Sequence, residues 1–326
     1  MISGVLFALA AGLMWGLVFV GPLLLPEYPA TLQSFGRYLA FGLIALPLAW
    51  FDRAALRVLA RADWIEALKL ALVGNIVYYL FLASAIQRAG GPLPTMIIGT
   101  LPVVIAITSK LRRAGRGARA EAPIAWRRLW PSLVPIALGI ALVNHVELGQ
   151  LRADPRADLG RYALGGLLAA GAVACWTWYP IRNAEWLRAH PDRSPRGWAT
   201  AQGLMTLPLA LAGYALTWGW NPASGAAFAM PFGPRPAAFI GLMFAIGLFA
   251  SWLGTLCWNE ASQRLPPTLS GQLIVFETLA ALSYAFVLRE SWPQAGTLIG
   301  VGLLVAGVVW AVRTQPAGAG SDAHPN

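Results

Sequence analysis

Apolar residues form long runs along the chain, and short segments containing Pro, Gly or charged residues separate these runs. A helix of about 20 apolar residues spans the hydrocarbon core of a bilayer. Ten such runs lie at roughly 3–25, 31–50, 66–87, 92–111, 131–148, 162–182, 197–219, 236–260, 266–288 and 293–312. The pattern predicts an all-α integral membrane protein with ten transmembrane helices.

The composition and charge agree with a membrane protein. Of the 326 residues, 57% are hydrophobic and 12% are charged, whereas soluble domains contain about 25% charged residues. The net charge is +10, but the basic residues lie mainly between the apolar runs, which indicates membrane topology and not a nucleic-acid site. With the N-terminus inside, cytoplasmic segments hold 16 basic residues and outer loops hold 6. Both termini are therefore predicted to be cytoplasmic.

The two halves of the chain resemble each other. The matching pairs are GVLFALAAGLMW (4–15) with GGLLAAGAVACW (165–176) and LPLA (46–49) with LPLA (207–210) at an offset of 161, Gln87-Arg88 with Gln263-Arg264 at 176, and Trp130-Pro131 with Trp292-Pro293 at 162. Longer loops at 218–236 and 110–130 account for the changes in offset. The chain is therefore interpreted as a duplication of five spans.

The duplication predicts a first five-helix repeat at 1–150 and a second at 161–313, followed by a disordered cytoplasmic tail at 314–326, which is small and polar. Because five is odd, the second repeat is inverted relative to the first. Inverted repeats are typical of secondary transporters that bind substrate near the membrane midplane. Channels and membrane enzymes also contain duplications, but the pattern favours transport.

Three segments resemble the EamA type of the drug/metabolite transporter superfamily. They are LMWGLVFV (13–20), SFGRYLAFGLIALPLA (34–49) with Arg37 at the family's second-helix arginine, and FETLAALSYAFVLRE (276–290) with Glu277 and Glu290 at the family's spacing. Thr278 replaces the family's proline and Arg289 its glycine. The resemblance extends over nearly the whole chain outside the tail.

The resemblance implies two repeats of five helices and a location in the bacterial inner membrane. Bacterial members of the YddG type export aromatic and other amino acids, and related groups export other metabolites. The resemblance therefore implies export of a small molecule without specifying which one.

Glu277 lies within an apolar run, where an ionisable side chain is costly and usually faces a cavity or a partner. At an offset of 176 its equivalent is Leu101, beside the helix-bending Pro102. Glu277 is predicted to face a central cavity, where it binds a substrate ammonium group or exchanges a proton. A protonated glutamate that bonds to a neighbouring helix is the structural alternative.

The third span contains Asn75, Tyr78, Tyr79 and Leu82, which share one helical face. The equivalent positions in the second half are Ser251, Gly254, Thr255 and Trp258. Tyrosine combines an apolar ring with a hydroxyl group, and an amide pairs with either charge of a zwitterion. A cavity lined from both halves is favoured over ordinary hydrogen bonding between helices.

Trp15 and Trp176 are also equivalent, and Pro180 in WTWYP (176–180) is predicted to bend the sixth span. A tryptophan near the midplane can stack on a flat substrate, whereas one near the interface belongs to the aromatic belt. The predicted substrate-binding residues are Asn75, Tyr78, Tyr79, Trp176, Ser251 and Glu277, and the predicted bending or gating residues are Pro102 and Pro180.

Arg37 lies about two turns into the second span, shallow enough for its side chain to reach the interface. A structural role is favoured for it over binding of a carboxylate. His145 and Glu147 point to different helix faces and form no metal pattern. Because no nucleotide, zinc or nucleophile motif occurs, no cofactor, metal or catalytic residue is expected.

The sequence thus predicts a secondary transporter that exports aromatic or neutral amino acids, or similar small metabolites, by alternating access. Its expected partners are a small-molecule substrate and membrane lipids, and it is expected to be a monomer or weak dimer. A carrier of sugar derivatives, nucleotide derivatives or drugs, or an importer, is an alternative. A lipid-modifying membrane enzyme using Glu277, His145 and Glu260 is a rival of another class.

Overall fold

The computed structural model describes residues 2–114, 126–153, 158–223, 228–265, 273–288, 290 and 292–313. Within these ranges every regular element is helical, as predicted. The elements are α1 (Ile2–Gly16), η1 (Leu17–Phe19), α2 (Val20–Leu24), α3 (Ala30–Phe51), α4 (Arg53–Arg57), α5 (Arg61–Leu70), η2 (Ala71–Val77), α6 (Tyr78–Ala89), α7 (Pro92–Ile98), α8 (Leu101–Ala114), α9 (Trp126–Ala153), α10 (Leu159–Ala189), α11 (Pro195–Ala223), α12 (Pro236–Ile246), η3 (Gly247–Leu253), α13 (Gly254–Arg264), α15 (Val275–Leu288) and α16 (Ala295–Arg313).

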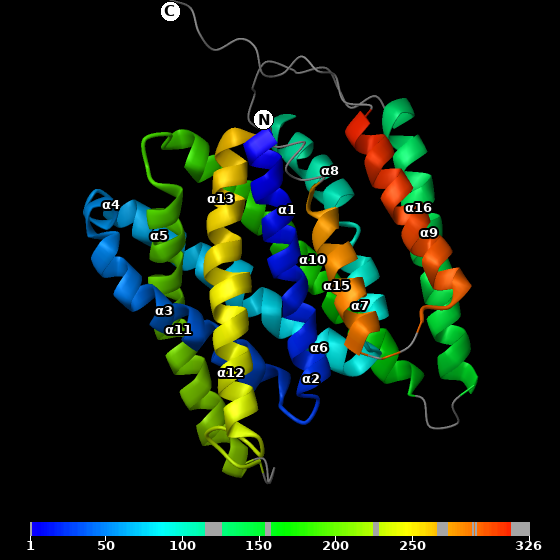
Figure 1. The fold of residues 1–326 in the computed structure, drawn as a ribbon, viewed down its shortest axis with the longest axis horizontal. Coiled ribbons are helices and arrows are strands. Elements are labelled where there is room, and N and C mark those ends of the chain that lie inside the picture. The colour runs from blue at the N-terminus through cyan, green and yellow to red at the C-terminus, as the bar shows by residue number, and fades with distance from the viewer. Residues whose placement is uncertain are drawn as a thin grey trace, which may run out of the picture.

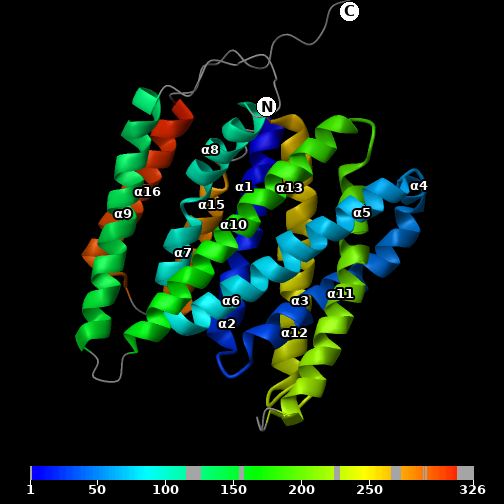
Figure 2. The ribbon, with the colours of Figure 1, turned by 180° about the vertical axis from the view of Figure 1, so that it is seen from behind.

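The helices form a bundle in which the start of α1 and the end of α16 lie at the same end (Figure 1). Figure 2 shows the opposite side, where α10 and α6 run next to each other. A helix satisfies its own backbone hydrogen bonds, which a bilayer core without water requires. Apolar helices of this length are therefore the expected result of the sequence pattern.

Five helical stretches in the described part of the chain are long and apolar enough to cross a membrane. They are Ile2–Leu24, Ala30–Phe51, Arg61–Ala89, Leu159–Ala189 and Pro236–Arg264. Shorter apolar helices lie at Pro92–Ile105, Trp130–Val143, Phe276–Leu288 and Ala295–Gly307. Each predicted span overlaps a helical segment, but the count of ten crossings stays a prediction. Residues 266–272, Arg289 and the predicted tail at 314–326 lie outside the described residues.

Several predicted spans are interrupted or locally widened. The fourth divides into α7 and α8, so that Pro102 is the second residue of a new helix, where a missing backbone N–H is tolerated. Pro180 instead lies inside α10, which runs through it without interruption. The third and eighth spans contain the π-helical turns η2 and η3, a local form that is frequent at functional sites.

Contacts between helices connect the two halves of the chain. Helix α1 packs against α13 and α15, α10 packs against α6, α7 and α8, and α3 packs against α11. Helices α9 and α16 pair with each other at one side of the bundle (Figure 1). The largest group of buried apolar side chains includes residues of α1, α3, α6, α10, α11 and α13, so the core lies between the halves.

Ion pairs also connect the halves near both ends of the bundle. At the end where α1 begins, Arg182 of α10 pairs with Glu66 of α5 at 2.7 Å, and Arg196 of α11 pairs with Asp52 at 2.8 Å. At the other end, Arg235 pairs with Glu27 at 2.6 Å.

Gly74 in η2 packs directly against the ring of Tyr179 in α10, so a Cβ atom at this position would collide with the ring. We expect Gly74→Ala to lower the thermal midpoint of the purified protein, because overpacking a core costs about 1–3 kcal/mol. The matched control is Gly241→Ala in α12, where no neighbouring atom lies within 4 Å of the added carbon. Equal midpoints for the two variants would contradict the close contact between η2 and α10.

Candidate functional site

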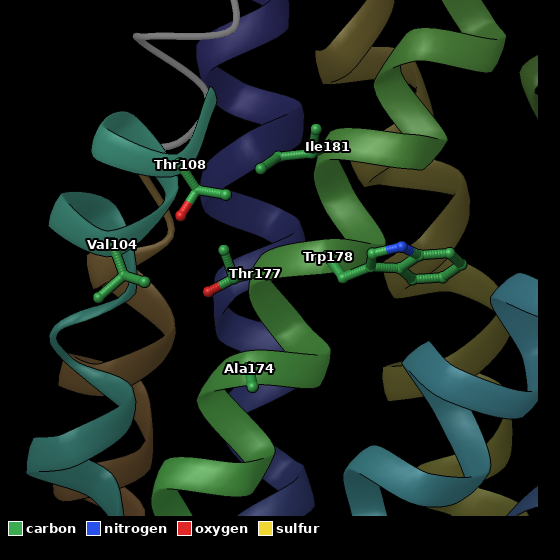
Figure 3. A pocket seen from close by; sticks show the side chains of 6 residues that line it. All are labelled: Val104, Thr108, Ala174, Thr177, Trp178 and Ile181. Carbon is green, nitrogen blue, oxygen red and sulfur yellow. The ribbon is translucent and has the colours of Figure 1, made fainter. Parts of the chain in front are cut away.

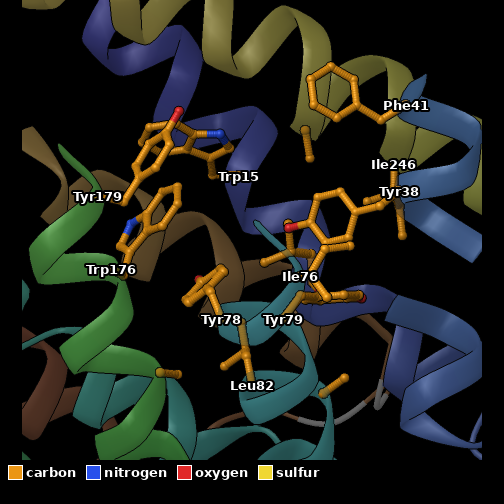
Figure 4. Packing of buried hydrophobic residues seen from close by; sticks show 14 of the residues in the cluster. Trp15, Tyr38, Phe41, Ile76, Tyr78, Tyr79, Leu82, Trp176, Tyr179 and Ile246 are labelled. Carbon is orange, nitrogen blue, oxygen red and sulfur yellow. The ribbon is translucent and has the colours of Figure 1, made fainter. Parts of the chain in front are cut away.

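Aromatic rings from four helices form a stack in the core (Figure 4). The ring of Trp176 lies parallel to Tyr78 at 4.6 Å and to Tyr179 at 4.8 Å between ring centroids. Trp15 meets the edge of Trp176 at 5.0 Å, and Trp258 lies 5.1 Å from Trp15. The stack therefore brings α1, α6, α10 and α13 to one place.

Glu277 of α15 lies beside this aromatic stack and is 1% exposed. Arg37 acts electrostatically on its carboxyl group, and the Trp176 and Tyr78 side chains lie near enough to this group to contribute as hydrogen-bond donors. Neither donor completes a bond of normal geometry, because within the described residues Glu277 Oε2, the Tyr78 hydroxyl and Trp176 Nε1 have no partner at hydrogen-bond distance and angle. One acceptor and two potential donors are thus buried near each other without being satisfied, which is uncommon in a folded protein.

Arg37 of α3 is a buried cation that acts electrostatically on the Glu277 carboxyl group, and it is 4% exposed. Its Nε donates a hydrogen bond to Ser251 Oγ at 3.0 Å. Its guanidinium carbon lies 4.8 Å from the ring centroid of Tyr38 and 4.5 Å from that of Tyr79. Its Nη1 has no partner among the described residues. We call Arg37, Tyr78, Trp176 and Glu277 together the polar centre.

Two of the predicted binding residues have their polar atoms engaged by neighbouring helices. The Tyr79 hydroxyl donates to the Val18 carbonyl at 2.9 Å, and Asn75 Nδ2 donates to Thr206 Oγ1 at 3.3 Å. Both bonds join separate helices, which is the ordinary hydrogen bonding between helices that the sequence leaves open as the alternative to a cavity. Tyr78 and Tyr79 are adjacent, but only Tyr78 has a hydroxyl group left without a partner.

The structure therefore groups the predicted residues in three ways. Tyr78, Trp176 and Glu277 lie close together. Tyr79 and Ser251 both contact Arg37, which belongs to the polar centre. Asn75 bonds to Thr206 of α11 instead. Tyr179 was not predicted, although it lies three residues after Trp176 and so on the same helix face.

A second polar group lies among α10, α11 and α13, and the sequence pattern did not indicate it. Asn183 Nδ2 donates to Asn259 Oδ1 at 2.8 Å, and Asn183 Oδ1 accepts from Trp198 at 2.8 Å and from Gln202 at 3.1 Å. Gln202 in turn accepts from the Tyr179 hydroxyl at 2.9 Å. Since these bonds join three separate helices, only their packing reveals the network.

A pocket of about 430 Å³ lies between α8 and α10 (Figure 3). Its lining residues are Val104, Thr108, Ala174, Thr177, Trp178 and Ile181. The Thr177 hydroxyl is buried and has no partner among the described residues. None of the predicted substrate-binding residues lines this pocket, although Thr177 directly follows Trp176.

The groups suggested for a membrane enzyme do not gather. Glu260 forms an ion pair with Arg264 on its own helix, and His145 is exposed. The side chain of Glu147 lies outside the described part. Among the described residues there is no group of three His, Cys, Asp or Glu side chains that could hold a metal ion.

The two adjacent tyrosines provide a test of the geometry. We expect Tyr79→Phe to lower the thermal midpoint, because it removes a buried hydrogen bond with a net contribution of about 1 kcal/mol. Tyr78→Phe should leave the midpoint unchanged or raise it, since it removes a buried hydroxyl group that has no partner. Thermal unfolding of the two purified variants measures the difference. A larger loss for Tyr78→Phe would contradict the assignment of the free hydroxyl.

Comparisons with known proteins agree with this fold. Residues 2–114 match the EamA-like transporter family. The chain is 56% identical over 316 residues to "Inner membrane protein YtfF" of Escherichia coli (strain K12), and the match covers 97% of each chain. A solved structure, described only as a crystal structure of a protein, matches with a TM-score of 0.66 and 17% identity over 95% of this chain and 98% of that one. The last likeness shows the fold alone. With the family model and the Escherichia coli relative, this chain belongs to the EamA family of membrane transporters in the drug/metabolite transporter superfamily.

Proposed function

We propose that the chain is a secondary transporter that exports aromatic or neutral amino acids, or similar small metabolites, by alternating access around the polar centre. The observation that carries this proposal is the set of buried polar atoms without partners at Tyr78, Trp176 and Glu277. A buried polar group is expensive unless it is hydrogen-bonded. A bound substrate supplies the missing partners.

The chemistry of the polar centre suits an amino acid. The Glu277 carboxylate can accept hydrogen bonds from an ammonium group. The faces of the Trp176 ring are covered by Tyr78 and Tyr179, so an aromatic substrate side chain would meet these rings at their edges, a geometry that aromatic pairs also prefer. The combination of ionisable groups with aromatic surface favours aromatic and neutral amino acids over sugar or nucleotide derivatives.

The proposal includes two inverted repeats at 1–150 and 161–313. The π-helical turns support it, because η2 begins at Ala71 and η3 at Gly247, an offset of 176. This offset is the one that relates Gln87-Arg88 to Gln263-Arg264 in the sequence. Both turns also have the same length of 7 residues.

The contacts between helices follow the same relation. Helix α1 contacts α13 and α15, and its proposed equivalent α10 contacts α6, α7 and α8, which are the matching helices of the first repeat.

Alternating access requires the halves to separate at one end while they close at the other. The ion pairs Arg182–Glu66 and Arg196–Asp52 join the halves at one end, and Arg235–Glu27 joins them at the other. We propose that these contacts break and form in turn. The interruption between α7 and α8 provides a discontinuous helix of the kind that transporters use near their substrate sites.

The transport proposal predicts that proteoliposomes containing the protein take up labelled aromatic or neutral amino acids. Glu277→Gln should reduce this uptake at least about tenfold or abolish its response to a pH gradient, because a charge-assisted hydrogen bond contributes about 1.5–3 kcal/mol. Glu260→Gln is the control, since Glu260 pairs within its own helix. If the wild type moves no amino acid, the proposed cargo is wrong. If Glu277→Gln equals the wild type, Glu277 is structural.

The proposed topology places both termini in the cytoplasm, and the position of α1 and α16 at one end of the bundle supports an even number of crossings. A reporter that is active only in the periplasm should be silent when it is fused after Arg313. A reporter that is active only in the cytoplasm should give a signal from the same position. The reverse pattern would overturn the orientation.

A further inference from the structure

Arg37 is a buried cation without an anionic partner in the part of the chain that the structure describes. An arginine side chain stays ionised at any pH at which proteins fold, and an ionised group within a membrane normally pairs with an opposite charge or faces water. Among the described residues, no carboxylate forms an ion pair with Arg37, although other arginines in the bundle do form such pairs. The side chain therefore retains the capacity to bind an anion.

The contacts of Arg37 hold its guanidinium group in place without neutralising it. Nε donates to Ser251 Oγ at 3.0 Å, and the rings of Tyr38 and Tyr79 flank the guanidinium carbon at 4.8 Å and 4.5 Å. Aromatic rings stabilise a cation by a modest amount and leave its N–H groups free. Nη1 is the atom that remains buried without a partner.

The polar centre has opposite charges on its two sides. Tyr78 interacts electrostatically with both Arg37 and Glu277, and its hydroxyl group has no hydrogen-bond partner among the described residues. Arg37 and Glu277 also interact with each other, but not as an ion pair within 4.0 Å. A donor on Arg37 and an acceptor on Glu277, each without a partner among the described residues, thus lie near one hydroxyl group that can donate or accept.

We propose that Arg37 binds the carboxylate of the transported molecule while Glu277 binds its ammonium group, which defines the substrate as a zwitterionic α-amino acid. Ser251 is a positioning residue, because it holds Nε and so directs the free nitrogen of the guanidinium group. This inference rests on the proposed function and gives it a chemical criterion: the carboxylate must be free.

The competing explanation gives Arg37 a structural role, in which its charge balances that of Glu277 and its side chain contacts no substrate. The two roles differ in one measurable respect. Replacing a structural arginine should lower the transport of all ligands alike, whereas replacing a carboxylate-binding arginine should lower only the transport of ligands that have a carboxylate. Removing the carboxylate from the ligand and removing the guanidinium group from the protein should therefore have effects that are not additive.

The test uses phenylalanine and phenylalaninamide, which share the ring and the ammonium group but differ in the carboxylate. Transport of each compound, and its inhibition by the other, is measured in proteoliposomes with the wild type, Arg37→Gln, Arg37→Lys and Ser251→Ala. The control is Arg88→Gln, because Arg88 is exposed and bonds to the Ser84 carbonyl of its own helix. The thermal midpoint of each purified variant reports on folding.

We expect the wild type to prefer phenylalanine at least about tenfold, the size of effect that one charge-assisted hydrogen bond gives. Arg37→Gln should lose this preference, because transport of phenylalanine falls and transport of phenylalaninamide does not. Arg37→Lys should keep part of the preference, and Ser251→Ala should reduce it. Arg88→Gln should transport both compounds as the wild type does. An equal loss for both compounds in a folded Arg37→Gln variant would overturn the inference and leave the transport proposal standing.

Two further outcomes are decisive. If Arg37→Gln does not fold, Ser251→Ala decides: a reduced preference for phenylalanine supports carboxylate binding, and an unchanged preference overturns it. If the wild type transports neither phenylalanine nor any other amino acid of a labelled panel, the proposed function fails, and the role of Arg37 fails with it.

Discussion

Hydrocarbon does not solvate charge, so each ionised side chain inside a membrane bundle must find its stabilisation in the protein or in a bound molecule. In this chain the constraint acts at Arg37 and Glu277, which are both buried in the same core. The aromatic rings and Ser251 supply part of the stabilisation for these two charges. The same rings pack α1, α6, α10 and α13 against one another, so the packing of the core and the solvation of its charges depend on the same side chains.

Adjacent residues in this core have different surroundings: one bonds to a neighbouring helix, and the next faces the polar centre. Successive positions on a helix point about 100° apart, so Tyr79 reaches the Val18 carbonyl while Tyr78 turns toward Trp176. The hydroxyl group of Tyr79 is consumed by a bond between helices, and that of Tyr78 is not. A similar division occurs along α10, where Trp176 belongs to the polar centre and Thr177 lines the separate pocket beside α8.

Much of the fold and part of the site follow from the sequence. The apolar runs identify the helices because the bilayer sets their length, and the cost of a buried carboxylate identifies Glu277. Tyr78 and Trp176 lie close to Glu277 in the structure, while the role of these residues in binding stays a prediction. The π-helical turns, the bond from Asn75 to Thr206 and the network around Asn183 could not be predicted, because each depends on which helices become neighbours. The depth of Arg37 in its apolar run permits its side chain to reach the interface. Its contacts with Ser251 and Tyr79 place the side chain in the core, and these contacts depend on which helices become neighbours.

The two π-helical turns bear on the order in which this molecule acquired its parts. A turn with one extra residue occurs at the same register in both halves. If the halves descend from one five-helix ancestor, as proposed, that extra residue belonged to the ancestor. The chemical groups have a different history, because the positions equivalent to Arg37, Tyr78 and Glu277 are Trp198, Gly254 and Leu101. The frame is then common to both copies, whereas the charges that give the centre a direction belong to one copy each and distinguish the two halves chemically.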